Sequence, residues 1–144
     1  MELRGFSPHA AMLVEYGDID IALDPLPFGG GTTSCEALWM GVPVVTWPGQ
    51  RPASRQTLGF LAPLGLADEC VAASAADYVA RATALAADPA RLVALRRALR
   101  PDMAASPLCN ASCFTPALEA AFDGMWRRWR DGLAAESFDV PGGL

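Results

Sequence analysis

The chain has 144 residues, of which 52% are hydrophobic and 19% charged, and its formal net charge is -5. This length and composition predict one folded domain with a hydrophobic core, and they exclude a disordered or fibrous protein. All eleven basic residues are arginine, scattered except for the pairs Arg96-Arg97 and Arg127-Arg128, so no basic stripe is available for a nucleic-acid backbone.

The cysteines favour a reduced, metal-free protein. Cys35, Cys70, Cys109 and Cys113 form no CxxC pair, and no histidine lies near them to complete a zinc set. We therefore expect no metal ion, no cofactor and a cytoplasmic location. The amino terminus has no charged region followed by a long apolar run, and no stretch has the length of a membrane span, so we expect neither a signal peptide nor a membrane partner.

The first half of the chain alternates strands with helices. In chain order it predicts the end of a strand at 3–6, a helix at 10–16 and a buried strand at 19–23, which Asp24-Pro25 ends. A helix through Ala37, Leu38 and Met40 then ends at Gly41, and the next strand follows at 43–47. Trp39 and Trp47 are expected to pack in the core around the sheet.

The second half is mostly helical. It predicts a helix at 54–61 and a short strand at 70–73. A helix at 77–87 follows, with one face formed by Tyr78, Val79, Ala82, Leu85 and Ala86, and Asp88-Pro89 caps the next helix, which carries Leu92, Leu95 and Leu99. The last helix starts at Thr115-Pro116 and presents an apolar stripe of Leu118, Phe122, Met125, Trp126 and Trp129. Strands alternating with helices predict an α/β fold: a Rossmann-like parallel sheet with right-handed crossovers and flanking helices.

A glycine-rich turn at 29–31 stands between a strand and a helix. A chain that passes from a buried strand through such a turn into a helix at Thr32-Thr33 points several unpaired N–H groups at one place, where the helix dipole adds positive potential. The turn therefore predicts a phosphate-binding site, although a glycine run also occurs as a flexible turn.

The sequence around this turn resembles a known family. The stretch LDPLPFGGGTTSCEALWMGVPVVTWPG over 23–49, the PASR at 52–55 and the SPL at 106–108 are similar to the carboxy-terminal part of O-linked N-acetylglucosamine transferases, in particular bacterial SPINDLY-like members. The resemblance covers about Gly5 to Trp129. It implies the carboxy-terminal, donor-binding lobe of a two-lobed GT-B glycosyltransferase that transfers N-acetylglucosamine from UDP-N-acetylglucosamine to serine or threonine of a protein acceptor.

The resemblance also sets the expected organisation. We expect a nucleotide-sugar-binding lobe at 1–135, incomplete as an enzyme, with a bracing helix at 115–133 and a flexible tail at 136–144. The other lobe, and the tetratricopeptide repeats that usually precede it in the family, would be the partners, and we expect the isolated chain to be inactive. Without that lobe we assign no catalytic residue.

The expected donor site lies around the glycine turn. Gly30, Gly31, Thr32, Thr33 and His9 would bind the diphosphate, and Glu36 would bind the ribose, as an acidic residue does in the family and in other Rossmann-like sites. Glu36 has a second interpretation, because Thr33-Ser34-Cys35-Glu36 fits a capping box that needs no ligand.

Two further residues have both functional and structural interpretations. His9, the single histidine, is either a surface residue or, by resemblance, a phosphate contact; Arg55 either pairs at the surface or reaches the phosphates. The chain departs from many relatives at Met12 and from the animal enzymes at Gly31, where they have histidines, and it lacks lysine. Each departure removes a donor for the leaving diphosphate.

Three other functions remain open on the sequence. The donor could be GDP-fucose or UDP-glucose, since the residues that select the sugar need not lie in this chain. The chain could be a truncated, non-catalytic module that binds a partner through its last helix. A phosphate-sensing Rossmann domain unrelated to sugar transfer is the weakest of the three.

Overall fold

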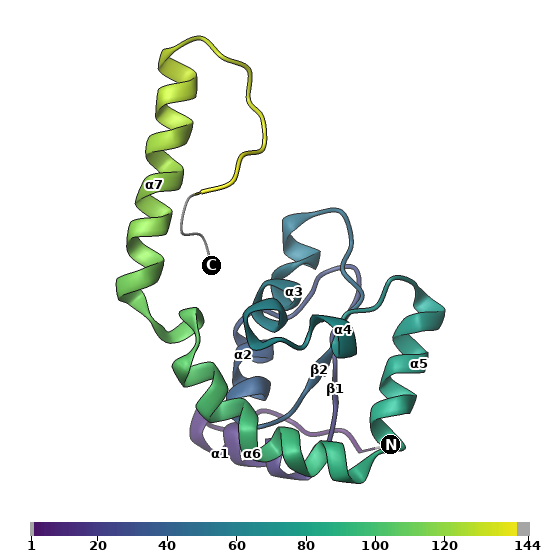
Figure 1. The fold of residues 1–144 in the computed structure, drawn as a ribbon. Helices are drawn as coiled ribbons and strands as arrows, with labels where there is room; N and C mark the ends of the chain where they lie inside the picture. The colour runs from purple at the N-terminus through teal and green to yellow at the C-terminus, as the bar shows by residue number, and fades with distance from the viewer. Residues whose placement is uncertain (1, 141–144) are drawn as a thin grey trace. The chain divides into compact units, whose positions relative to one another are not determined.

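The computed structural model describes residues 2–140, which divide into two compact units, Met1–Met103 and Ala104–Leu144. The first unit contains α1 (His9–Glu15), β1 (Ala22–Leu23), α2 (Thr32–Trp39), β2 (Val44–Val45), α3 (Gln56–Leu61), α4 (Ala67–Cys70), α5 (Ala75–Ala86) and most of α6 (Pro89–Ala105) (Figure 1). The second unit contains α7 (Ala111–Arg130). Single 3₁₀ turns lie at Tyr16–Asp18, Pro52–Ser54, Ala62–Leu64 and Pro107–Cys109.

The sheet is small and parallel, as the alternation of strands and helices predicts. β1 pairs with β2, with Ala22 opposite Val44 and Leu23 opposite Val45. A parallel bridge between Thr46 and Val71 extends the order beyond β2. The fold is therefore a helix-rich α/β arrangement with a two-stranded parallel sheet and one further parallel bridge directly after β2.

Three expected strands differ from the structure. β1 is shorter than the predicted 19–23 and is not buried, since Leu23 is 58% exposed; it lies at the edge of the described sheet and packs less than β2. Residues 3–6 form no strand. Most of 70–73 also lies outside the sheet, because Cys70 ends α4 and Val71 contributes one bridge only.

The core lies between β2 and the helices around it. Its fully buried side chains include Leu38 of α2, Val45 of β2, Leu61 of α3 and Cys70 of α4. Burial raises the pKa of the Cys70 thiol to about 12, so the thiol stays protonated and packs as a small apolar group.

Gly41 ends α2 in the way the sequence predicts. Its φ is +83°, its N–H donates to the carbonyl of Leu38 at 3.0 Å, and the N–H of Val42 donates to the carbonyl of Ala37 at 2.8 Å. This pair of bonds is a Schellman motif, which turns the chain directly from α2 into β2.

Arg96 of α6 ties together two segments that lie far apart in sequence. Its guanidinium donates to the carbonyl oxygens of Tyr16 and Met40 at 3.0 and 3.2 Å, and also to that of Ile19. Asp88 caps α6 by accepting from the N–H of Arg91 at 2.9 Å. As predicted, Leu95 and Leu99 are buried. The clamp formed by Arg96 holds the end of α2 beside the segment that leads into β1.

Ser74 and Asp77 cap α5 reciprocally. The Ser74 hydroxyl accepts from the N–H of Asp77 at 3.2 Å, and the Asp77 carboxylate accepts from the N–H of Ala73 at 2.8 Å and pairs with Arg81 at 2.9 Å. The bond from Ala73, followed by the one from Arg81, lowers the pKa of Asp77.

We expect the stability contributed by Asp77 to depend on pH. Because folding lowers its pKa, the contribution is present above the unfolded value of 3.8 and is lost as the pH falls through the folded value. Asp77→Asn should therefore lower the urea midpoint at about pH 7, and the gap to wild type should shrink below about pH 4. Asp102→Asn, at an exposed position on α6, is the control. A gap that persists in acid would contradict the assignment.

The second unit consists of α7 and the segment after it. α7 begins at Ala111, four residues before the predicted Thr115-Pro116. The carbonyl of Asn110 accepts from the N–H groups of Cys113 and Phe114, so the helix starts there, and Pro116 lies inside it. The predicted apolar stripe is present but exposed: Phe122 is 59%, Trp126 57% and Trp129 71% accessible.

The predicted tail at 136–144 touches α7 where it is described. Glu136 pairs with Arg128 at 2.9 Å, and the ring of Phe138 lies within 2.8 Å of where a Cβ on Gly124 would stand. Residues 141–144 of that prediction lie outside the described part of the chain.

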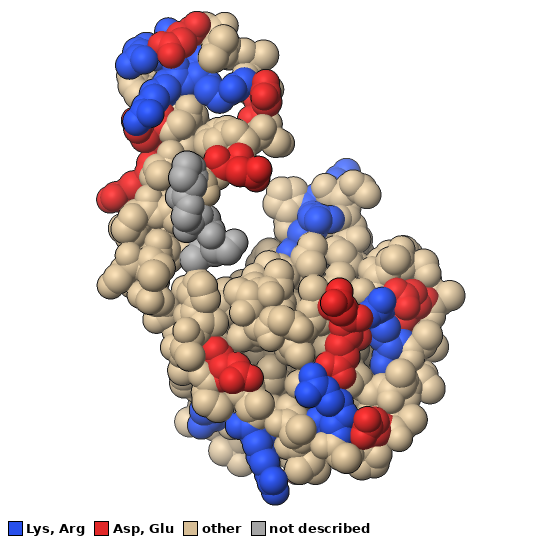
Figure 2. All heavy atoms as spheres, viewed as in Figure 1, with Lys and Arg blue, Asp and Glu red and all other residues tan. Residues whose placement is uncertain are grey.

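The surface carries mixed charge. Over the face shown in Figure 2, arginines and carboxylates lie beside one another, and ion pairs such as Arg91 with Glu69 at 2.7 Å contribute to this pattern. None of the helices described over residues 2–140 is both long enough and apolar enough to cross a membrane.

Candidate functional site

The glycine turn joins the end of β1 to the start of α2, as the sequence predicts. The N–H of Gly29 donates to the carbonyl of Ala53 at 3.0 Å, and the N–H of Gly30 donates to the carboxylate of Asp24 at 2.6 Å. The carbonyl of Gly30 accepts from the Thr57 hydroxyl at 3.2 Å. The turn is thus bonded on both sides and is not a loose linker, which argues against the flexible-turn alternative.

Close packing explains why Gly30 has no side chain. A Cβ at this position would lie 2.3 Å from the Ser34 hydroxyl and 3.1 Å from that of Thr33. Ser34 is itself buried and bonded to the Thr57 hydroxyl at 3.0 Å, so it has little room to move away.

The amino terminus of α2 presents free donors. Gly31 is the N-cap, and Thr32 and Thr33, the first two helical residues, are exposed. Among residues 2–140, no acceptor bonds the N–H groups of Gly31, Thr32 or Thr33. Free N–H groups at the positive end of a helix dipole form a binding site for an anion, and phosphate fits them well.

One predicted donor is already engaged. Gly30 was expected to bind the diphosphate, but its N–H, the one donor a glycine has, is bonded to Asp24. Among the described residues, the N–H groups of this turn that remain without an acceptor are those of Gly31 to Thr33.

Glu36 faces His9 and does not form the capping box. The helix starts at Thr32, so Thr33 is not an N-cap, and no side chain caps α2. The Glu36 carboxylate lies 2.7 Å from Nε2 of His9, which is at the start of α1. The Glu36 side chain is 15% exposed and that of His9 70%, so the pair lines the surface beside the free N–H groups.

A second contact joins α1 to this part of α2. The Tyr16 hydroxyl donates to the carbonyl of Thr33 at 3.2 Å. Burial, followed by the charge of Glu36, raises the pKa of Tyr16, so the hydroxyl remains a donor. α1 and the segment after it thus contact α2 at two places, through His9 to Glu36 and through Tyr16 to Thr33.

The Arg55 side chain is bonded to a backbone carbonyl. Its guanidinium donates to the carbonyl of Gly49 at 3.0 Å, which braces the loop after β2. Trp39, expected in the core, is 38% exposed, and the Arg100 guanidinium lies 5.5 Å from the centre of its ring. The ring packs against an arginine because α2 ends at the surface.

Asp24 is the residue that sequence reasoning missed as part of the site. It is 4% exposed, and its two carboxylate oxygens accept from the N–H of Gly30 and the hydroxyl of Thr46, both at 2.6 Å. In the sequence, Asp24 marks only the end of a strand. An acidic residue at the carboxyl end of a strand, five residues before a glycine turn, was the available signal.

Of the hollows on the described surface of the first unit, three bear on the choice of site. The one beside the site has a volume of about 180 Å³ and is lined by Tyr16, Asp24, Gly30, Thr33 and Ser34 among others. A more apolar pocket of about 390 Å³ lies where β1 and β2 end and includes Leu26, Pro27, Trp47 and Arg51. In open parallel sheets ligands bind beyond the carboxyl ends of the strands, where both of these hollows lie.

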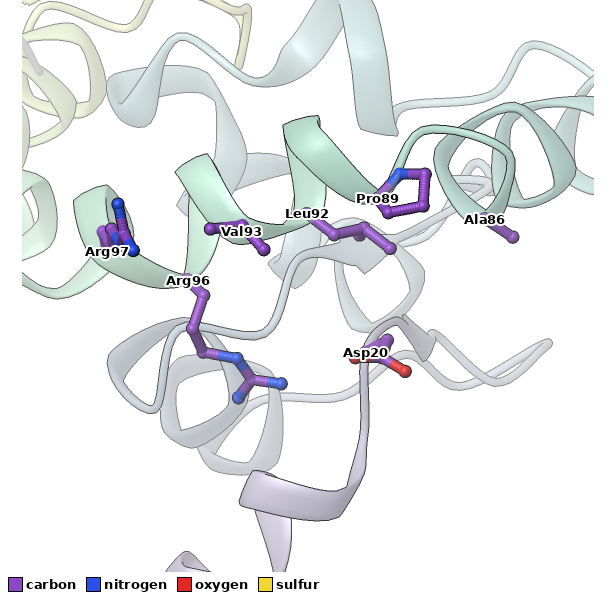
Figure 3. Close-up of a pocket in the computed structure, with 7 residues that line it drawn as sticks. All are labelled: Asp20, Ala86, Pro89, Leu92, Val93, Arg96 and Arg97. Carbon is purple, nitrogen blue, oxygen red and sulfur yellow. The ribbon is translucent and has the colours of Figure 1, made fainter.

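The third hollow, of about 350 Å³, lies before the amino end of β1 (Figure 3). Leu92 and Val93 of α6 line it, and Asp20 faces it from the segment before β1. The Arg96 guanidinium at its edge already bonds backbone carbonyls. We therefore place the candidate site at the glycine turn. Among residues 2–140 no cluster of three or more histidine, cysteine or acidic side chains could hold a metal ion.

Comparison with known proteins gives consistent results. The profile of glycosyl transferase family 41 matches residues 11–118. The chain is 46% identical over 119 residues to a rice protein described as a probable UDP-N-acetylglucosamine–peptide N-acetylglucosaminyltransferase SPINDLY, and 44% identical over 126 residues to a petunia protein of the same description. These alignments cover 83% and 88% of this chain and 13% of each relative.

A solved structure agrees with this similarity. A mutant O-GlcNAc transferase from Thermobaculum terrenum matches with a TM-score of 0.75 and 43% identity over 84% of this chain, which corresponds to 23% of the solved chain. The present chain therefore spans a small part of the length of these relatives, and that part contains the glycine turn.

Proposed function

Because this chain belongs to glycosyl transferase family 41, we propose that it is the donor-binding part of a protein O-glycosyltransferase. The reaction would transfer N-acetylglucosamine from UDP-N-acetylglucosamine to a serine or threonine hydroxyl of a protein. The observation that supports this most is the set of free N–H groups at Gly31, Thr32 and Thr33, beside the pair formed by Glu36 and His9.

Each group has a role in the proposed site. The free N–H groups and the threonine hydroxyls would accept the donor diphosphate and stabilise the charge that develops on it as the glycosidic bond breaks. Glu36 would accept hydrogen bonds from the ribose hydroxyls. His9, whose Nε2 lies 2.7 Å from the Glu36 carboxylate, would contact the diphosphate.

The acceptor side of the site would come from outside this chain. The chain covers 13% of its plant relatives, so we propose a partner lobe that completes the cleft and supplies the groups that act on the acceptor hydroxyl. A cytoplasmic location is part of the proposal and is supported by the exposed thiols of Cys109 and Cys113, which suit a reducing compartment.

NMR titration with UDP tests the proposal directly. UDP should shift the backbone amides of Gly31 to Cys35, and a parallel titration with GDP shows which nucleotide is preferred. Preference for GDP would favour GDP-fucose as donor in the same site. If neither nucleotide shifts these amides, the chain is not a donor-binding lobe, and the rival of a non-catalytic module, suggested by the exposed stripe of α7, replaces the proposal.

Glu36→Gln is expected to separate ribose binding from structural support. We expect UDP affinity to fall about 5- to 30-fold, or about 1 to 2 kcal/mol, because an amide accepts fewer hydrogen bonds than a carboxylate. Stability should change little, since Glu36 caps no helix and glutamine can still bond His9. Calorimetric titration measures the affinity, with Glu119→Gln on the exposed face of α7 as control. Lost stability with unchanged affinity would show that Glu36 is only structural.

A further inference from the structure

We infer that Asp24 is a positioning residue for the donor site: it fixes the peptide of Gly30 so that the next three N–H groups face the donor. The inference rests on the proposed function for its ligand. Its structural part, the control of the turn by Asp24, stands on contacts within the chain.

The Asp24 carboxylate is held from outside the turn. The N–H of Asp24 donates to the carbonyl of Val45 at 2.9 Å, which fixes its backbone to β2. The Tyr78 hydroxyl of α5 donates to the carbonyl of Asp24 at 2.9 Å. Thr46 of β2 donates to one carboxylate oxygen, which leaves the other oxygen directed at Gly30. β2 therefore sets where the carboxylate lies, whereas the bond from Tyr78 holds only the backbone carbonyl of Asp24.

The turn wraps closely around this carboxylate. A Cβ on Gly29 would lie 3.1 Å from one Asp24 oxygen, and a Cβ on Gly30 would lie 3.3 Å from the other. With the N–H of Gly30 directed inward to Asp24, the chain enters α2 with the N–H groups of Gly31 to Thr33 free. The orientation of one peptide thus decides which donors remain for a phosphate.

Electrostatics alone would not place a carboxylate here. A buried negative charge next to a phosphate site repels the ligand, and burying it costs free energy unless its hydrogen bonds are satisfied. Both oxygens of Asp24 are satisfied, one of them by the turn itself. The two roles of the Asp24 carboxylate therefore predict opposite effects of its removal. If its repulsion of UDP dominated, removal of the charge would tighten binding, whereas if its bond to Gly30 dominates, loss of that bond weakens binding.

Three variants distinguish these effects. Asp24→Ala removes the contact with Gly30, and UDP affinity should fall at least about tenfold. Asp24→Asn keeps an oxygen for Gly30 and an amide that can donate to Thr46, so affinity should stay within about threefold of wild type. Tyr78→Phe removes a different hydrogen bond of the same residue and should leave affinity unchanged while it lowers the urea midpoint of unfolding.

NMR supplies a readout that needs no ligand. The Gly30 amide proton, bonded to a carboxylate, should move upfield in Asp24→Asn and further in Asp24→Ala, and the amides of Gly31 to Thr33 should shift in Asp24→Ala but not in Tyr78→Phe. If Asp24→Ala does not fold, the upfield shift of the Gly30 amide in Asp24→Asn still tests whether that amide is bonded to the Asp24 carboxylate. Failure of wild type to bind UDP would remove the proposed function, while these shifts would still decide the role of Asp24.

Several results would overturn the inference. They are an unchanged Gly30 amide in Asp24→Asn, UDP binding by Asp24→Ala within about threefold of wild type, binding more than about threefold tighter by either Asp24 variant, and equal loss of affinity in Asp24→Ala and Tyr78→Phe. The last result would show that Asp24 acts through overall stability and not through the turn.

Discussion

The isolated chain is expected to transfer no sugar, and activity is expected to appear when the missing lobe is added. The reason is that the proposed site binds only the donor, while catalysis also requires an acceptor hydroxyl held in line with the glycosidic bond. In the matching Thermobaculum terrenum structure, the part equivalent to this chain makes up 23% of the whole.

The test combines this chain with a separately expressed amino-terminal part of that enzyme, which should raise transfer from UDP-N-acetylglucosamine by at least about 10²-fold over either part alone. The amino-terminal part mixed with Glu36→Gln is the control for transfer that depends on this chain. Turnover by the chain alone would contradict the expectation. Transfer that does not differ between wild type and Glu36→Gln would show that Glu36 does not contribute to donor binding.

Gly41→Ala is expected to be the most destabilising of the substitutions considered, by about 2 to 4 kcal/mol. Two costs add. Alanine is strained at a φ of +83°, and its Cβ would lie 2.6 Å from the carbonyl oxygen of Arg96. Because that atom belongs to the backbone of α6, it cannot move aside as a flexible side chain can. Unfolding in urea, followed by circular dichroism, measures the loss.

Gly65 provides a matched control for this prediction. It has a similar φ of +68°, and a Cβ there would meet no atom within 4 Å. Gly65→Ala should therefore show only the cost of the left-handed backbone, about 1 kcal/mol. Equal losses in the two variants would mean that α6 moves away at little cost and that the contact with Arg96 contributes nothing.

Local patterns in the sequence predicted the helices and the glycine turn well. Gly41 ends α2, and Asp88 caps α6, because a single residue with a special backbone or side-chain preference is enough to specify each end. The sequence likewise indicated the turn that leads into a helix, and the structure leaves the N–H groups of Gly31 to Thr33 free there.

Features that depend on tertiary contacts were predicted less well. The exposure of Leu23 depends on what packs beside β1, and Cys70 belongs to a helix because of how α4 packs. Neither of these tertiary contacts can be predicted from the local sequence pattern. The capping box at Thr33 to Glu36 fits the sequence, yet Glu36 bonds His9, 27 residues away. Asp24 was missed for the same reason, since its partners Gly30 and Thr46 come from two different segments.

The clamp formed by Arg96 bears on the thermodynamics of ligand binding. By bonding the carbonyls of Tyr16 and Met40, it fixes the end of α2 that is remote from the glycine turn, together with the segment that enters β1. The segments on either side of the turn, the one that enters β1 and α2, are thus fixed before any ligand binds. The site is preorganised, so association would order few backbone torsions and would carry a small conformational-entropy penalty. Loosening the clamp with Arg96→Lys would raise that penalty, and calorimetry would record it as a less favourable binding entropy with little change in enthalpy.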